Sequence, residues 1–226
     1  EFDKFWEDGF FEVPIEKTKK IMFKDFRDNP KINPLNTPSG KIEITSSTIK
    51  KYNLKDCKGH PTWIEPYEWL GRKEKFPLHL LSNQPEYRLH GQLDNAEYSL
   101  KNKIKDREPV LINIEDAKER NIENNDIVLI FNKRGRVLAG ARLSDEIMKG
   151  VLVLSTGAWF DPDYEINTDL HGNPNVLTKD IGTSQLSQAP TSHTCLVEIR
   201  KAKQNEIKKV KIFLKPQTQK KLEQKY

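Results

Sequence analysis

The sequence predicts a mainly β fold, in which six short strands close into a barrel with small helices between them, preceded by an extended N-terminal arm. From residue 76 onward, short runs rich in Val, Ile and Leu recur, and turn residues end each run. Before residue 76, prolines interrupt the apolar residues before any run reaches the length of a regular element. Closure into a barrel is favoured because it leaves no strand edge unpaired.

The predicted arm covers residues 1–75. The stretch TPSGKIEIT favours a turn followed by an alternating strand through Ile42 and Ile44. The short apolar clusters of the arm are too few to form a core, so we expect it to pack on the barrel or on neighbouring domains. The interrupting prolines are Pro14, Pro30, Pro34, Pro38, Pro61 and Pro66.

The predicted barrel covers residues 76–200. A short helix is expected over EDAKERN, residues 115–121, and a tight turn over residues 133–136. The connection that follows the fifth strand is more than thirty residues long and rich in proline, which favours a functional loop. The six predicted strands lie in FPLHLLS (76–82), PVLINI (109–114), DIVLIF (126–131), RVLAGARL (136–143), VLVLSTGAWF (151–160) and TCLVEI (194–199).

Charge and composition argue against several classes of protein. The net charge is +5, but residues 201–226 hold nine Lys against two Glu, so residues 1–200 carry −2. We therefore expect no nucleic-acid binding, and we expect residues 201–226 to be a Lys-rich, solvated or partner-facing tail. No apolar run approaches the length of a membrane helix, and Cys57 and Cys195 lack metal-site spacing.

Two polar loops hold the candidate binding residues. They lie around residues 82–95 and 159–188, and they are rich in Asn, Gln, His, Ser and Thr. Amides and hydroxyls both donate and accept hydrogen bonds, which suits a ligand with heterocyclic edges, ribose and phosphate. The glycine patterns of the usual phosphate-binding loops are absent. The sequence therefore predicts binding of such a ligand and offers no candidate catalytic residue.

These motifs, in this order, resemble a known family. The stretches LSNQPEYRLHGQLDN, GAWFDP and HGNPNVLTKDIGTSQLSQAP, together with GHPTWIEPYEW in the arm, are similar to the C-terminal domain of the trimethylamine N-oxide, dimethyl sulfoxide and biotin sulfoxide reductases. The resemblance covers residues 1 to about 200 and leaves out the Lys-rich tail.

The resemblance implies a double-psi β-barrel of the aspartate-decarboxylase-like type, which binds bis-molybdopterin guanine dinucleotide with molybdenum jointly with upstream domains. It implies that the molybdenum ligand lies upstream, so no metal ligand is expected in this chain. The residues expected to contact the cofactor are Gln84, Arg88, His90, Gln92, Trp159, Asn173, Asn175, Thr183 and Gln188.

By the same resemblance, the expected partners are the upstream domains of the same polypeptide, a small N-oxide or S-oxide substrate and an electron-donor protein. The periplasm is the expected compartment, with the cytoplasm as the alternative, and the chain alone is expected to be inactive. A stand-alone double-psi barrel that binds a ligand or partner is the competing hypothesis. Its self-processing decarboxylase form lacks the required Gly-Ser pair in this sequence.

Several of the polar residues also have a purely structural interpretation. Asn173 and Asn175 flank Pro174 and are typical turn formers, a role that is compatible with cofactor binding. His171 and Asp126 are each expected to cap a turn. His79 lies in an apolar strand and is expected to be a hydrogen-bonded histidine of the core.

Overall fold

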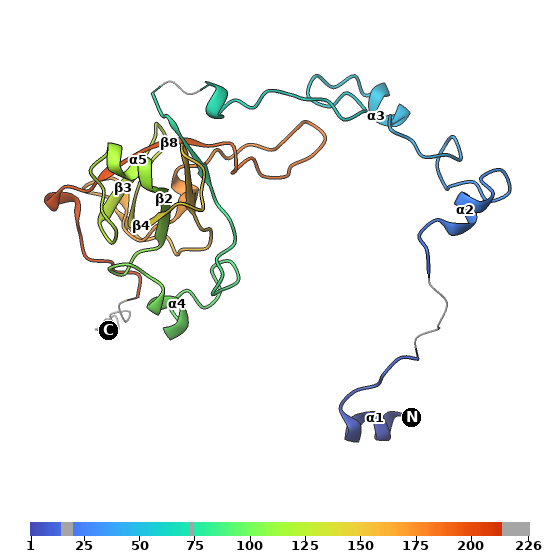
Figure 1. The fold of residues 1–226 in the computed structure, drawn as a ribbon, viewed down its shortest axis with the longest axis horizontal. Coiled ribbons are helices and arrows are strands. Elements are labelled where there is room, and N and C mark those ends of the chain that lie inside the picture. Colours follow the sequence, from blue (N-terminus) through green and yellow to red (C-terminus); the bar gives the residue numbers. More distant parts are fainter. Residues whose placement is uncertain (15–19, 73–74, 214–226) are drawn as a thin grey trace, which may run out of the picture. The chain divides into compact units, whose positions relative to one another are not determined.

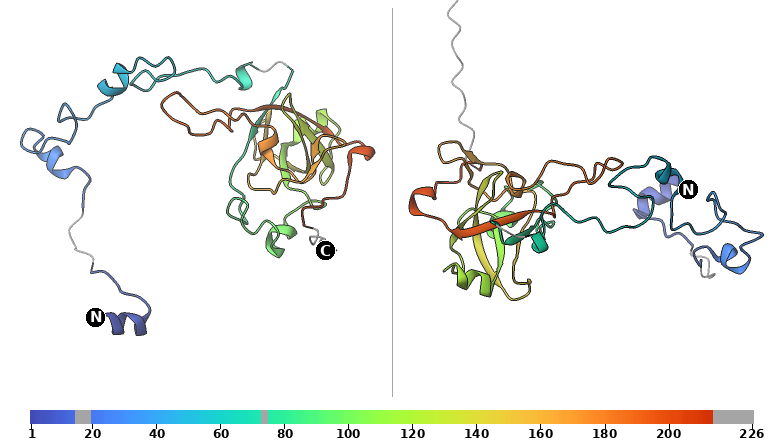
Figure 2. Two further views of the ribbon diagram at one scale, coloured as in Figure 1. Left: turned by 180° about the vertical axis from the view of Figure 1, so that it is seen from behind. Right: turned by 90° about the horizontal axis from the view of Figure 1, so that it is seen from above.

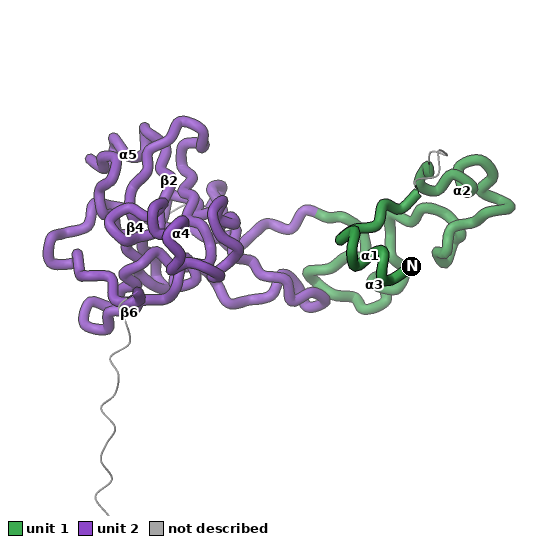
Figure 3. The backbone as a smooth tube through the Cα atoms, turned by 90° about the horizontal axis from the view of Figure 1, so that it is seen from below, with its two compact units in different colours: residues 1–62 green, residues 63–226 purple. Residues whose placement is uncertain are grey.

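The computed structural model describes residues 1–14, 20–72 and 75–213. The chain divides into two compact units, Glu1–Thr62 and Trp63–Tyr226, which are drawn in different colours in Figure 3. Each unit is described by itself.

Unit 1 has short helices and almost no interior. Its helices are α1 (Phe2–Asp8), α2 (Lys24–Asp28) and α3 (Ser47–Lys51), and none of them contains a buried residue. The strand expected through Ile42 and Ile44 is wrong, because these side chains are 72% and 78% exposed and the backbone there is irregular. A strand needs a neighbour to pair with, and the described part of unit 1 supplies only an isolated bridge between Leu54 and Cys57.

Unit 2 is built on a closed six-stranded barrel, which confirms the predicted fold class (Figure 1). The barrel strands pair in the order β2-β5-β1-β8-β3-β4, and pairing of β2 with β4 closes the ring. Two very short strands extend the sheet beyond β4. The strands are β1 (Leu78–Leu81), β2 (Pro109–Asn113), β3 (Ile127–Phe131), β4 (Arg136–Ser144), β5 (Val151–Leu154), β6 (Pro162–Asp163), β7 (Thr168–Asp169) and β8 (Leu196–Lys201).

Short helices occupy the connections of the barrel. The expected helix after β2 is confirmed as α5 (Ile114–Glu119), which begins at Asn113, whose side-chain oxygen accepts a hydrogen bond from the amide of Glu115. Helix α4 (Glu97–Lys101) was not expected from the sequence. Three 3₁₀ turns complete the set: η1 (Leu70–Arg72), η2 (Pro174–Val176) and η3 (Gln204–Glu206).

The strand directions bring three connections to one end of the barrel. Strands β1 and β5 are parallel neighbours, with Leu81 beside Val153, so both end at the same place. Strand β3 ends there as well, because β8 is antiparallel to both β1 and β3. The connections over residues 82–108, 132–135 and 155–195 therefore all leave from this end, which we call the loop end. Helix α5 lies in a connection at the opposite end (Figures 1 and 2).

The barrel interior is a continuous apolar core. Alternate residues of the strands fill it, and among them Leu80, Ile112, Ile130 and Leu152 are fully buried. A second cluster packs outside β3 and β4 and includes Leu129, Leu138 and Leu170.

The second cluster also includes part of the segment expected to be a solvated tail. Val210 is only 7% exposed, and Ile212 and Phe213 pack beside it. Residues 203–213, which we call the C-terminal strap, therefore lie against the barrel. The solvated tail expected from Lys201 onward is wrong for these residues, because the Lys-rich composition hides an apolar face formed by Ile207, Val210, Ile212 and Phe213. Residues 214–226 lie outside the described part of the chain.

Candidate functional site

At the loop end, the first residues of two connections contact each other. Because β1 and β5 are parallel neighbours, residues 82–95 and residues 155–161 start side by side. We call these segments the first loop and the second loop. The amide of Thr156 donates to the carbonyl oxygen of Asn83 at 2.9 Å, and the hydroxyl of Ser155 donates to the side chain of Asn83 at 3.0 Å.

Further along, the two loops approach closely enough to require glycine. Gly157 has a φ of +90°, in the region that favours glycine, and a Cβ there would overlap the carbonyl oxygen of His90. The loop backbones are therefore in direct contact at the point where His90 turns outward with a φ of +50°.

Trp159 holds the two loops together. Its indole Nε1–H donates to the carbonyl oxygen of Gly91 at 2.7 Å, and its backbone amide donates to Oδ2 of Asp94 at 2.9 Å. Its carbonyl oxygen is 2.8 Å from Nδ1 of His171. Its ring packs against that of Phe213 in the C-terminal strap, with the ring centroids 5.8 Å apart. The polar groups of Trp159 are thus all hydrogen-bonded within the protein.

A buried cluster of charges lies beneath the first loop. Arg88 is paired with Asp94 at 3.4 Å and with Glu108 at 3.2 Å, and the side chains are fully buried. Lys103 lies 2.6 Å from Asp94 and 2.8 Å from Glu108. Burial alone would raise the pKa of Asp94, but the hydrogen bond and charge of Lys103 hold it below its ordinary value. Asp94 is therefore ionised, and the cluster pairs two basic side chains with two acidic ones.

His171, in the connection after β5, packs against this charge cluster. It is fully buried, its ring lies edge-on to Phe213 with centroids 4.8 Å apart, and Nε2 has no hydrogen-bond partner. Burial lowers its pKa, and the charge of Lys103 lowers it further, so the ring is neutral. The expected role as a simple turn cap is therefore wrong for His171.

Asp169 shapes the HGNPN turn that follows. Its carboxylate accepts hydrogen bonds from the backbone amides of Asp161, His171, Gly172 and Asn173 at 2.8–3.3 Å. Burial raises the pKa of Asp169, and these four amides oppose that effect. The turn is thus built by the backbone around one buried carboxylate, which leaves its outward side chains available.

The candidate residues of the first loop differ in how exposed they are. Arg88 donates to the carbonyl oxygens of His90 and Thr156 at 3.1 Å, so it braces the loops from inside. Gln84 lies on the surface with Nε2 3.0 Å from Nδ1 of His90, which leaves Nε2 of His90 available. Gln92 is exposed.

The candidate residues between positions 173 and 188, in the connection after β5, form two groups. Asn173 caps η2, since its Oδ1 accepts from the amide of Asn175 at 2.9 Å, whereas Asn175 itself is exposed. Thr183 and Gln188 lie in a hairpin-like excursion, in which the hydroxyl of Thr183 donates to the carbonyl oxygen of Ser187 at 3.1 Å. All candidates belong to connections that leave the loop end.

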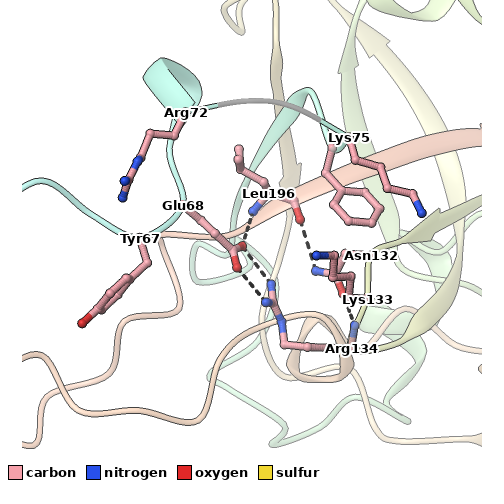
Figure 4. A pocket seen from close by; sticks show the side chains of 9 residues that line it. Tyr67, Glu68, Arg72, Lys75, Asn132, Lys133, Arg134 and Leu196 are labelled. Atoms are coloured by element: carbon pink, nitrogen blue, oxygen red, sulfur yellow. Dashed lines mark hydrogen bonds and ion pairs between the residues drawn. The ribbon is translucent and has the colours of Figure 1, made fainter.

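A pocket that the sequence did not reveal opens beside the turn between β3 and β4 (Figure 4). At its centre, Glu68 makes a two-pronged ion pair with Arg134 at 2.7 and 2.9 Å and accepts from the amide of Leu196 at 2.8 Å. Lys179, from the connection after β5, lies 3.0 Å from Glu68. The only signal in the sequence was the Arg-Gly turn itself. The pocket is lined by Tyr67, Glu68, Arg72, Lys75, Phe76, Asn132, Lys133, Arg134 and Leu196.

The donor set at the loop end suits a heterocyclic ligand. Exposed amides, the imidazole of His90 and hydroxyls supply both donors and acceptors, and the buried hydroxyl of Ser82, just after β1, has no partner within the protein. In the residues that the structure describes, no group of three or more His, Cys, Asp or Glu is placed to hold a metal ion.

Comparison with known proteins finds a family model and several relatives that match this chain. The family model "Molydopterin dinucleotide binding domain" matches residues 78–196, which run from the start of β1 to the start of β8. Trimethylamine-N-oxide reductase of Haemophilus influenzae is 48% identical over 208 residues, covering 88% of this chain and 25% of the relative. Biotin sulfoxide reductase of Cereibacter sphaeroides is 43% identical over 199 residues, covering 88% and 27%.

Among solved structures, acetylene hydratase from Pelobacter acetylenicus has a similar fold. The TM-score is 0.59 at 18% identity, over 77% of this chain and 25% of that one. The chain thus spans about a quarter of the length of the relatives it matches. None of the helices in the described ranges has the length and hydropathy of a membrane-spanning segment.

Proposed function

The chain belongs to the molydopterin dinucleotide binding domain family, and from this we propose that its loop end forms one wall of a site for bis-molybdopterin guanine dinucleotide carrying molybdenum. The observation that carries the proposal is the convergence of the first loop and the connection after β5 at one end of the barrel. These two segments hold every residue expected to contact the cofactor.

The proposed contacts fall into groups according to whether each side chain has hydrogen-bonding groups that are not already used within the protein. His90, Gln92 and Asn175 are exposed, and we assign them direct hydrogen bonds to the pterin, ribose or guanine groups. Gln84 orients His90, while Thr183 and Gln188 extend the site along the hairpin-like excursion. Trp159 donates both of its N–H groups within the protein, and Arg88 and Asn173 also make hydrogen bonds there, although Nη1 of Arg88 has no partner. We assign these three residues contact chiefly through shape.

In the full-length protein we propose reduction of a small N-oxide or S-oxide, in line with the names of the relatives. When bound, the molybdenum cofactor supplies oxygen-atom transfer, and protein groups orient it and tune it.

Upstream domains of the same polypeptide complete the site, and a separate protein donates electrons. The exposed aromatic side chains of unit 1, such as Trp6 and Phe10, favour packing against those domains. We place the protein in the periplasm, with anaerobic respiration as its setting.

Mass spectrometry and molybdenum analysis of the full-length protein from its native host test the proposal. We expect a released pterin guanine dinucleotide in a two-to-one ratio to molybdenum. A protein that contains neither would contradict the proposal and would favour the stand-alone barrel that binds another ligand or partner. The isolated 226-residue chain should show no reduction of trimethylamine N-oxide with a reduced viologen donor.

A further inference from the structure

The buried charge cluster beneath the first loop connects three segments of the proposed site, which are the first loop, the second loop and the HGNPN turn. Asp94 belongs to the first loop, its Oδ2 accepts from the amide of Trp159 in the second loop, and its Oδ1 pairs with Lys103. Nδ1 of His171, which leads into the HGNPN turn, lies 3.7 Å from Asp94. In this region Asp94 is the side chain that contacts all of these segments.

We propose that Asp94 is a positioning residue, which fixes the first loop, the second loop and the HGNPN turn relative to one another before cofactor binds. This inference rests on the proposed function for its consequence, but the coupling itself concerns residues of this chain alone. Asp94 has no exposed surface, so it acts through Trp159 and Arg88 and does not touch the ligand.

Charge balance explains why a carboxylate is needed at this position. Arg88 and Lys103 face Asp94 and Glu108 in a space closed to water, and Tyr87 donates its hydroxyl to Glu108 at 3.0 Å. Removing one partner of a buried ion pair strands the other charge, which costs more than losing the attraction. Loss of the Asp94 charge would leave Lys103 and Arg88 to share one carboxylate, and the first loop would have to open to hydrate them.

The C-terminal strap completes the enclosure of this cluster. The ring of Phe213 lies edge-on to His171, and Nζ of Lys103 lies 6.0 Å from its centroid. Backbone amides of Lys211 and Ile212 donate to Oδ2 of Asp161, at 2.5 and 3.2 Å, which holds the strap in place. Water is therefore excluded from above the cluster, and the charges depend on one another.

The test uses the full-length protein, prepared from cells grown without molybdate, and measures amide hydrogen exchange. In Asp94→Asn we expect exchange at Thr156 and Gln92 to rise by about tenfold or more, because the amides of both residues make loop hydrogen bonds without touching Asp94. Asp116→Asn is the matched control, since Asp116 is also buried and accepts a backbone hydrogen bond, from Gly150 at 2.6 Å, but lies away from the loop end. It should leave both amides unchanged.

A charge-balanced variant separates positioning from a general loss of stability. Asp94→Asn combined with Lys103→Met removes one charge of each sign, so exchange at Thr156 and Gln92 should return to within about threefold of the wild type. Unchanged exchange in Asp94→Asn, an equal rise in Asp116→Asn, or no recovery in the double variant would overturn the proposal. If wild-type protein from cells grown with molybdate contained neither pterin nor molybdenum, the proposed function would be contradicted. The exchange experiment would still decide whether Asp94 couples the loops.

Discussion

The indole N–H of Trp159 donates a hydrogen bond of 2.7 Å to the carbonyl oxygen of Gly91, and this bond joins the two loops at the end of the barrel. Trp159→Phe removes the donor and leaves a half-buried carbonyl oxygen without its partner. We expect a loss of about 1–3 kcal/mol in the free energy of unfolding. Urea denaturation of the 226-residue chain measures this loss. A variant as stable as the wild type would show that the bond does not hold the loops together.

The C-terminal strap gives a second prediction. Phe213 packs against His171 and Trp159, so Phe213→Ala should expose the charge cluster and increase amide exchange in residues 156–161. Lys209→Ala, four residues away on the exposed side of the strap, should leave exchange unchanged. Hydrogen-exchange mass spectrometry distinguishes the two variants. Equal effects would mean that packing of the Phe213 ring does not specifically shield the charge cluster.

The pocket beside the turn between β3 and β4 predicts a dependence of stability on pH. Burial would raise the pKa of Glu68, but the hydrogen bonds from Arg134, Leu196 and Lys179 lower it from 4.5 to about 2. A carboxyl group whose pKa is lowered by folding stabilises the folded state above its unfolded pKa and loses that effect as the pH falls. Wild type should therefore exceed Glu68→Gln in stability at pH 6, and the difference should shrink between pH 4.5 and 2. Denaturation midpoints at several pH values measure it. A difference that stays constant across this range would contradict the ion pair.

The arm provides a fourth prediction. Among the described residues of unit 1, no hydrophobic side chain is buried, whereas β3 and β5 lie in the core. In the isolated chain, amides of residues 1–14 and 20–62 should exchange much faster than those of Val128, Ile130 and Leu152. Uniform protection would show that the arm shares the core of the barrel.

The barrel could be read from the sequence because each strand is a short apolar run ended by turn residues, as in residues 127–131 and 151–154. The turn role expected for Asp126 is confirmed by its hydrogen bond from the amide of Glu123 at 2.9 Å. His79 is hydrogen-bonded as expected, with Nε2 2.5 Å from the carbonyl oxygen of His193, but it is only half-buried, so the expected position in the core is wrong.

What the sequence did not reveal depends on contacts between distant residues. Asp94, Lys103 and Glu108 look like ordinary surface charges, and only the folded chain shows that they enclose one another. The burial of His171 depends on Phe213, which lies in a segment whose lysines dominate the composition. The expected strand at Ile42 failed for the related reason that pairing requires a neighbour, which a local pattern does not specify.

The central claim is that the loop end binds the dinucleotide cofactor. The most direct measurement is the molybdenum content per protein of the full-length His90→Ala and Asn175→Ala variants, with Lys209→Ala as the control. Each loop variant removes a hydrogen bond at a cost of about 1–3 kcal/mol, so cofactor retention should fall by roughly tenfold or more while the stability of the cofactor-free protein changes little. Full molybdenum occupancy in both loop variants, or an equal loss in Lys209→Ala, would contradict the claim and place the cofactor elsewhere on the protein.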